Sequence, residues 1–179
     1  MRLFISAITK FLLGVLLVGA LVFLSAGRFF FGGCLLMLIL FLPMFVAGII
    51  MLVKNPDLLK SRLDAKEKSR EQSVVVKLSG LMFLVGFILA GLGVRFNFYL
   101  LPKSVSVAAA VFFLLAYLLY ARVLRENTYL SRTIGVQENQ KVIDTGLYGV
   151  VRHPMYSATL ILFLSMPLVL GSVYAFLVF

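Results

Sequence analysis

The side chains best suited to chemistry are gathered in one polar segment, residues 137–156. This segment holds His153, the single histidine of the chain, next to Arg152. Tyr148 and Tyr156 lie in the same stretch and add two aromatic hydroxyl groups. Such a set could bind a small polar ligand at a membrane interface. It could equally be an anchor, with the arginine on lipid phosphates and the tyrosines at the interface.

The local sequence predicts how this segment is held. Pro154 suits the first turn of a helix, which places His153 at the capping position. The free N–H groups of that first turn would face the segment and favour an anionic group such as a carboxylate. Gly146 and Gly149 permit a positive φ or the close approach of a ligand. We therefore expect a polar loop capped by the start of a helix that enters the membrane.

The composition of the chain predicts a membrane around this loop. The 179 residues are 62% hydrophobic with a mean hydropathy of +1.08, whereas a soluble domain is about 45–50% apolar. The net charge of +10 could indicate a nucleic-acid partner. In a membrane protein, however, lysine and arginine collect on cytoplasmic loops and face anionic headgroups. We therefore expect membrane lipids as partners and no nucleic acid.

Cys34 lies in an apolar run and is predicted to be a small buried side chain.

The apolar runs predict an all-α fold, a polytopic bundle of five transmembrane spans plus an incomplete sixth. A span needs about 20 mostly apolar residues. The predicted spans cover residues 11–26 (with a start as early as Leu3), 30–53, 78–100, 104–123 and 154–170. After a turn at Gly171 and Ser172, seven more residues cannot cross a bilayer at about 1.5 Å each. We therefore expect the sequence to be a C-terminally truncated fragment.

The chain is predicted to be a single integral membrane domain, residues 1–179. It begins with a helical hairpin, residues 1–53, and its core, residues 78–179, carries the polar loop 126–156. The stretch 54–77 between them is predicted to be an amphipathic surface helix or a solvated loop. With the N-terminus inside, 14 of the 17 lysines and arginines fall on the cytoplasmic side. We therefore expect the loop to lie on the cytoplasmic face. The shortness of the chain favours a prokaryotic cytoplasmic membrane protein.

The loop resembles a known family signature. The pattern runs from Gly146 to Tyr156 as G-L-Y-x-x-x-R-H-P-x-Y and follows the apolar pair Val142 and Ile143. It is similar to the signature of the isoprenylcysteine carboxyl methyltransferases and their bacterial and archaeal relatives, membrane enzymes that use S-adenosylmethionine. More distant kin are the phospholipid N-methyltransferases and the sterol reductases of similar topology. The helical layout fits this family from about Lys77 onward, whereas the first two helices are not diagnostic.

The resemblance implies S-adenosyl-L-methionine as the cofactor and a set of residues that contact it. It implies no metal and assigns no catalytic residue. In this family a tail after the final hairpin supplies an arginine near the substrate and a glutamate on the cofactor, and the sequence ends at Phe179 before either. The cofactor-binding residues it implies are Gln137, Gln140, Lys141, Val142, Ile143, Tyr148, His153, Pro154, Met155 and Tyr156.

The resemblance further implies methyl transfer to a lipid-like or prenylated carboxylate that enters from the bilayer. A carboxylate is ionised at neutral pH, so the protein must align the reactants and exclude water but needs no base. A phospholipid or small amine, the alternative acceptor in the same fold, would need a base such as Glu138 or Asp144. A non-enzymatic membrane protein whose loop binds a partner, and a reductase relative, remain further alternatives.

Overall fold

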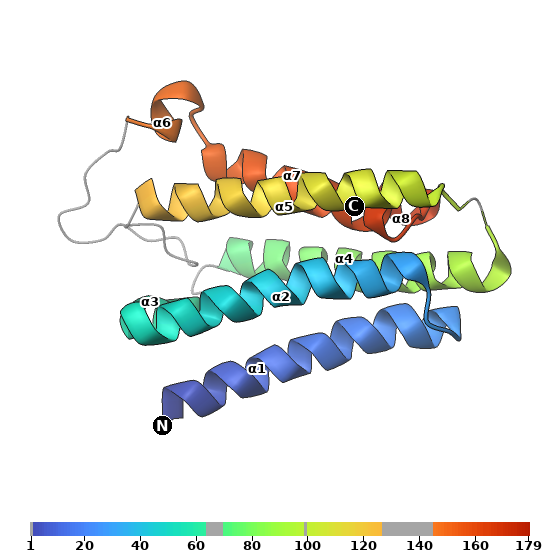
Figure 1. Ribbon diagram of the computed structural model, residues 1–179, viewed down its shortest axis with the longest axis horizontal. Coiled ribbons are helices and arrows are strands. Elements are labelled where there is room, and N and C mark those ends of the chain that lie inside the picture. The colour runs from blue at the N-terminus through green and yellow to red at the C-terminus, as the bar shows by residue number, and fades with distance from the viewer. Residues whose placement is uncertain (1, 64–69, 99, 127–144) are drawn as a thin grey trace.

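The computed structural model describes residues 2–63, 70–98, 100–126 and 145–179, and these form a bundle of helices (Figure 1). Among these residues the structure has no strand, only an isolated bridge between Leu100 and Ser172. The predicted all-α architecture is therefore confirmed for this part of the chain. The elements are α1 (Arg2–Gly19), the π-helical turn η1 (Ala20–Leu24), α2 (Phe31–Lys54), α3 (Pro56–Leu63), α4 (Arg70–Phe96), α5 (Lys103–Glu126), α6 (Leu147–Val150), α7 (Pro154–Val169) and α8 (Val173–Val178).

Within the described ranges, four helical segments are long and apolar enough to cross a membrane. They are Leu3–Leu24, Phe31–Lys54, Ser73–Phe96 and Lys103–Glu126. The predicted fifth span is present as α7, whose 16 residues make it shorter than these four. Helices suit lipid because they satisfy their own backbone hydrogen bonds. The number of spans beyond four and the orientation of the N-terminus stay predictions.

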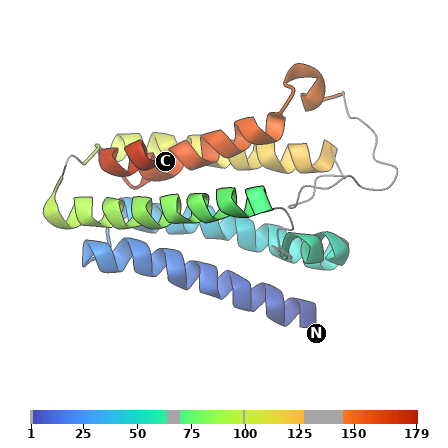
Figure 2. The ribbon, with the colours of Figure 1, turned by 180° about the vertical axis from the view of Figure 1, so that it is seen from behind.

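Successive long helices run in opposite directions, so the described parts of the polar stretches lie at one end of the bundle (Figures 1 and 2). We call this the loop end and define it by residues 54–63, 126 and 145–153. The opposite end, the turn end, is defined by residues 27–30, 97–98, 100–102 and 170–172. A hydrogen bond from Lys10 Nζ to the carbonyl oxygen of Leu63, 2.6 Å long, joins α1 to α3 near the loop end.

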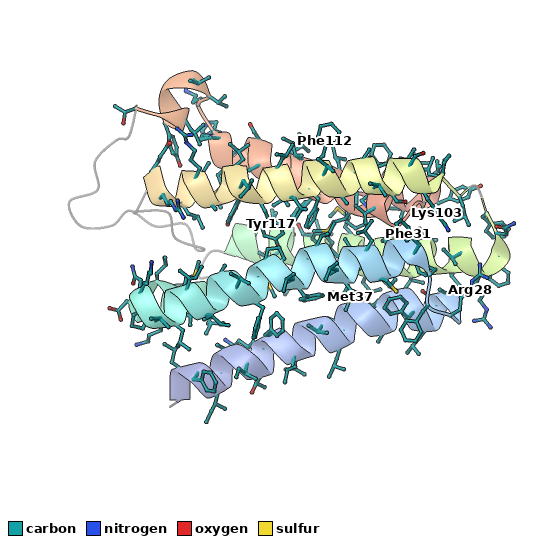
Figure 3. The ribbon with its side chains drawn as sticks, in the orientation of Figure 1. Arg28, Phe31, Met37, Lys103, Phe112 and Tyr117 are labelled. Atoms are coloured by element: carbon teal, nitrogen blue, oxygen red, sulfur yellow. The ribbon has the colours of Figure 1, made fainter. Side chains whose placement is uncertain are left out.

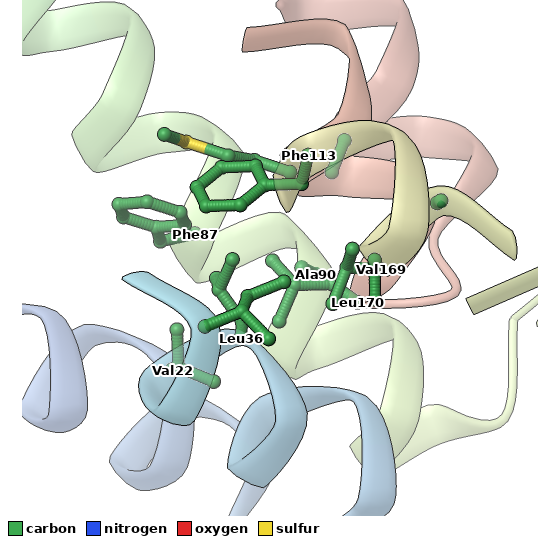
Figure 4. Close-up of a cluster of buried hydrophobic side chains, with 12 residues drawn as sticks. Val22, Leu36, Phe87, Ala90, Phe113, Val169 and Leu170 are labelled. Carbon is green, nitrogen blue, oxygen red and sulfur yellow. The ribbon is translucent and has the colours of Figure 1, made fainter. Parts of the chain in front are cut away.

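The bundle has three layers around one apolar core. α1 lies at one edge, α2 and α4 form the middle, and α5, α7 and α8 form the other side (Figures 1 and 2). The core side chains come from all of these layers and include Val22, Leu36, Phe87, Phe113 and Val169 (Figure 4). Many large apolar side chains instead point outward, as expected of a protein whose surroundings are lipid.

Close helix packing depends on small residues where two backbones meet. A Cβ on Gly32 of α2 would lie 2.5 Å from the carbonyl oxygen of Val169 in α7. Only glycine therefore fits where α2 crosses the end of α7, as is common between membrane helices.

The prediction that Cys34 is a small buried side chain is wrong, because its side chain is exposed on the outer surface of α2.

The helix boundaries depart from the predictions around the stretch 54–77. α4 begins at Arg70, eight residues before the predicted start at Leu78, because hydropathy marks the apolar part of a helix rather than its end. The predicted surface helix is α3, eight residues long. Asn55 caps it, with its side-chain oxygen accepting from the Leu58 N–H at 3.0 Å. Leu59 is buried, so this side chain packs α3 onto the bundle.

The predicted turn at Gly171 and Ser172 is confirmed. Gly171 has a φ of +72°, and the Ser172 hydroxyl oxygen accepts from the Ala175 N–H at 3.2 Å to cap α8. α8 then turns back along α4. Its neighbour Phe179 lies with its ring 5.2 Å from Phe83 and 5.8 Å from Phe87, measured between ring centres.

Candidate cofactor site

Five of the ten predicted cofactor-binding residues fall in the part of the chain that the structure describes. Tyr148 lies in α6, and the other four lie at the start of α7. These four are His153, Pro154, Met155 and Tyr156. The remaining five lie outside the described residues: Gln137, Gln140, Lys141, Val142 and Ile143.

Glu126, the last residue of α5, joins the two ends of the loop. One carboxylate oxygen accepts from the Leu147 N–H at 2.7 Å, and the other accepts from Arg122 Nε at 3.0 Å. The Glu126 side chain is 22% exposed, against 69% for Arg122. The first turn of α6 is thereby held against the end of α5, although 21 residues separate Glu126 from Leu147.

The sequence analysis assigned no role to Glu126, although one signal was present. A carboxylate at the C-terminal end of a helix is unfavourable, because the helix dipole is negative there. A glutamate in that position therefore indicates a partner elsewhere in the fold. Here that partner is the N–H of Leu147, the first residue of α6, where the helix dipole is positive.

Gly146 makes this contact possible. Its φ of +59° and ψ of −127° define a backbone conformation that is essentially restricted to glycine. A Cβ at this position would also lie 2.7 Å from a carboxylate oxygen of Glu126. Gly146 thus has the positive φ that its residue type permits. Gly149 does not, since it lies within the helical turn α6 and donates its N–H to the Gly146 carbonyl oxygen at 3.2 Å. The close approach of a ligand at Gly149 stays a prediction.

The start of α7 is built as predicted. Pro154 begins the helix and His153 occupies the capping position, but the His153 side chain makes no capping hydrogen bond. The His153 carbonyl oxygen accepts from the Tyr156 N–H at 3.0 Å. The first turn of α7 therefore faces the loop without a side-chain cap, and its end of the helix dipole is positive.

The predicted residues at the start of α7 divide into two groups. The rings of His153 and Tyr156 lie 5.2 Å apart between centres, tilted by 30°, and Tyr156 is 70% exposed. Together they present an aromatic surface at the loop end. Pro154 is buried and Met155 is half-buried, so these two contribute to the packing of α7 against the bundle. The structure therefore brings His153 and Tyr156 together and separates Pro154 from them.

Comparison with known proteins gives one match. Residues 104–179 match the model of the phospholipid methyltransferase family. The matched region contains nearly all of α5, the loop with both of its ends, α7 and α8, whereas α1–α4 lie outside it. No curated protein matches the chain, and no solved structure matches it. Together with the four apolar helices, the match supports the class of membrane methyltransferases.

Proposed function

We propose that this protein is an S-adenosylmethionine-dependent methyltransferase that acts on a lipid-borne acceptor. The observation that carries the proposal is the family match over residues 104–179, which contains the whole polar loop. The position of the loop supports it as well. Both described ends of the loop lie at one end of a bundle of apolar helices, where a polar cofactor from water can meet an acceptor from lipid.

The described residues fit this cofactor. S-Adenosylmethionine supplies a methyl group activated by a positively charged sulfur. The uncapped first turn of α7 suits a carboxylate, such as that of an amino-acid moiety. The exposed ring pair of His153 and Tyr156 suits an aromatic base, which stacks on such surfaces. Tyr148 and the predicted residues outside the described part of the chain would complete the set.

The chain itself contributes position and exclusion of water. Because methyl transfer is a direct displacement, the alignment of donor and acceptor accounts for much of the rate. The bond between Glu126 and Leu147 keeps the two ends of the loop together at the place where the reactants meet. Glu126 is engaged by Leu147 and Arg122, so we assign it a positioning role and not that of a base.

Two acceptor chemistries follow from different observations. The loop signature favours a lipid-like or prenylated carboxylate, which needs no base. The family match favours a phospholipid amine, whose nitrogen must be neutral to accept the methyl group. Membranes that contain the protein and radiolabelled cofactor distinguish the two. A methyl ester releases labelled methanol in base, whereas an N-methyl group does not.

Cofactor binding is the direct test of the proposal. The protein in lipid nanodiscs should bind radiolabelled S-adenosylmethionine in a saturable manner, with unlabelled cofactor competing. The absence of binding by the folded protein would refute the methyltransferase proposal.

We also propose that the loop end faces the cytoplasm, where the cofactor is made. Reporter domains fused at the N-terminus test this, because the N-terminus lies at the same end of the bundle (Figure 1).

A further inference from the structure

A second polar feature lies at the turn end, opposite the loop. A cavity of about 150 Å³ lies between the starts of α2 and α5 and the turn that joins α7 to α8. Arg28, Lys103 and Ser106 are its polar lining residues, and Phe31 and Leu101 are among the apolar ones. Figure 3 shows Arg28, Phe31 and Lys103 at this same end of the bundle. The cavity combines positive charge with an apolar wall.

Within the described ranges, no acidic residue lies at the turn end. Arg28 lies there, and Arg95 and Lys103 lie in the adjoining turns of α4 and α5, whereas all seven aspartates and glutamates fall within residues 57–71 and 126–144 of the sequence. Among the residues that the structure describes, the one salt bridge, between Arg122 and Glu126, is at the loop end. These cations can therefore attract an anion from outside the protein, because an unneutralised charge at a membrane surface is attracted to anionic headgroups.

Two contacts hold the cationic groups at the cavity. Arg28 Nη2 donates to the carbonyl oxygen of Val94 at 3.4 Å, which uses only one of its five N–H groups. Lys103 Nζ lies 5.7 Å from the centre of the Phe31 ring, within cation–π range. Both groups thus have N–H donors left for a ligand.

The backbone and a buried hydroxyl add to the site. α2 begins at Phe31 and α5 at Lys103, so two positive helix ends lie at the same cavity. Ser106 is 4% exposed and lines the cavity, and its Oγ has no hydrogen-bond partner within the described ranges. A buried hydroxyl without a protein partner indicates a ligand or water that completes it.

We propose that this cavity binds the phosphate group of an anionic phospholipid from the leaflet at the turn end. Arg28 and Lys103 neutralise the phosphate, and Ser106 donates a hydrogen bond to it. The apolar wall formed by Phe31 and Leu101 takes the first carbons of the lipid. At about 150 Å³ the cavity is smaller than the about 300–1,000 Å³ of most small-molecule sites, so it holds only part of a headgroup. Free phosphate shares the anionic chemistry but makes no use of the apolar wall.

The test measures which lipid stays with the protein. The wild-type chain is reconstituted with equimolar phosphatidylglycerol and phosphatidylcholine, transferred to detergent, and its retained lipid is measured by native mass spectrometry. We expect preferential retention of phosphatidylglycerol. Lys103→Gln and Arg28→Gln should each lower it by about tenfold, the loss expected for one charge-assisted contact. Lys103→Arg should retain it.

Arg95→Gln is the matched control. It removes one positive charge from the same end of the bundle, but Arg95 does not line the cavity, so retention should stay near that of the wild type. An equal loss in Arg95→Gln, or equal retention of both lipids by the wild type, would overturn the proposal. Displacement of the lipid by inorganic phosphate, with equal protection of the wild type against heat, would assign the site to a free anion instead. Because Lys103→Gln and Arg28→Gln act independently, failure of one variant to fold leaves the other to decide.

Discussion

Replacing Gly146 by alanine should loosen the loop end and leave the rest of the bundle unchanged. The new Cβ would lie 2.7 Å and 3.1 Å from the two carboxylate oxygens of Glu126. Contacts under 3.0 Å essentially never occur for a real Cβ, so the carboxylate must withdraw. The Leu147 N–H then loses the acceptor that holds α6 to α5.

The backbone at this position sets the size of the effect. A side chain held at a φ of +59° and a ψ of −127° costs about 1–3 kcal/mol. Alanine also restricts the opened chain, which offsets about 0.4–1 kcal/mol of this cost. The remaining cost is about 0.6–2 kcal/mol, which corresponds to about a 3- to 30-fold shift of the local opening equilibrium.

Hydrogen exchange at the Leu147 amide measures this equilibrium without any cofactor. In Gly146→Ala the exchange rate should rise by about 3- to 30-fold, while amides in the middle of α2 stay as slow as in the wild type. Gly80→Ala is the control, because a Cβ on Gly80 meets nothing within 4 Å. Unchanged exchange at Leu147 would refute the contact with Glu126. Faster exchange with unchanged affinity for S-adenosylmethionine would count against the cofactor site and leave the contact standing.

Three further substitutions test other parts of the chain. His153→Ala should weaken S-adenosylmethionine binding. It should not change the thermal unfolding midpoint, because the His153 side chain is exposed. Unchanged binding by the folded variant would contradict the site assignment. Gly91→Ala should destabilise the protein by about 1–3 kcal/mol, because its Cβ would lie 2.7 Å from the carbonyl oxygen of Val22. A midpoint equal to that of Gly80→Ala would show that this contact relaxes freely. Ser172→Ala removes the cap of α8 and should cost about 1 kcal/mol, measured as a lower midpoint with unaltered cofactor affinity.

The sequence by itself determined where the long apolar helices are and several of the residues that end them. In lipid, backbone N–H and C=O groups can form hydrogen bonds only with each other, so a long apolar run that crosses the membrane forms a helix. The local signals were equally direct. Asn55 and Pro56 separate α2 from α3, Gly171 turns the chain after α7, and Pro154 begins α7. Each of these depends on the backbone chemistry of one residue and its neighbours.

Boundaries without such a residue were less accurate. α4 extends to Arg70, through polar residues that hydropathy excludes, because a helix continues into water when no residue stops it. The same limit applies to exposure. Cys34 lies in an apolar run, but only the packing of α2 against its neighbours decided that this side chain faces outward.

The tertiary structure alone decided which distant residues meet. Glu126 contacts Leu147 because the end of α5 and the start of α6 lie at one end of the bundle, and Gly146 leaves room for the carboxylate. At the other end, Arg28 and Lys103 line one cavity although 75 positions separate them in the sequence. Such contacts depend on which helix faces pack together. Composition and periodicity do not determine that pairing, since each of the four long helices is apolar on most of its surface.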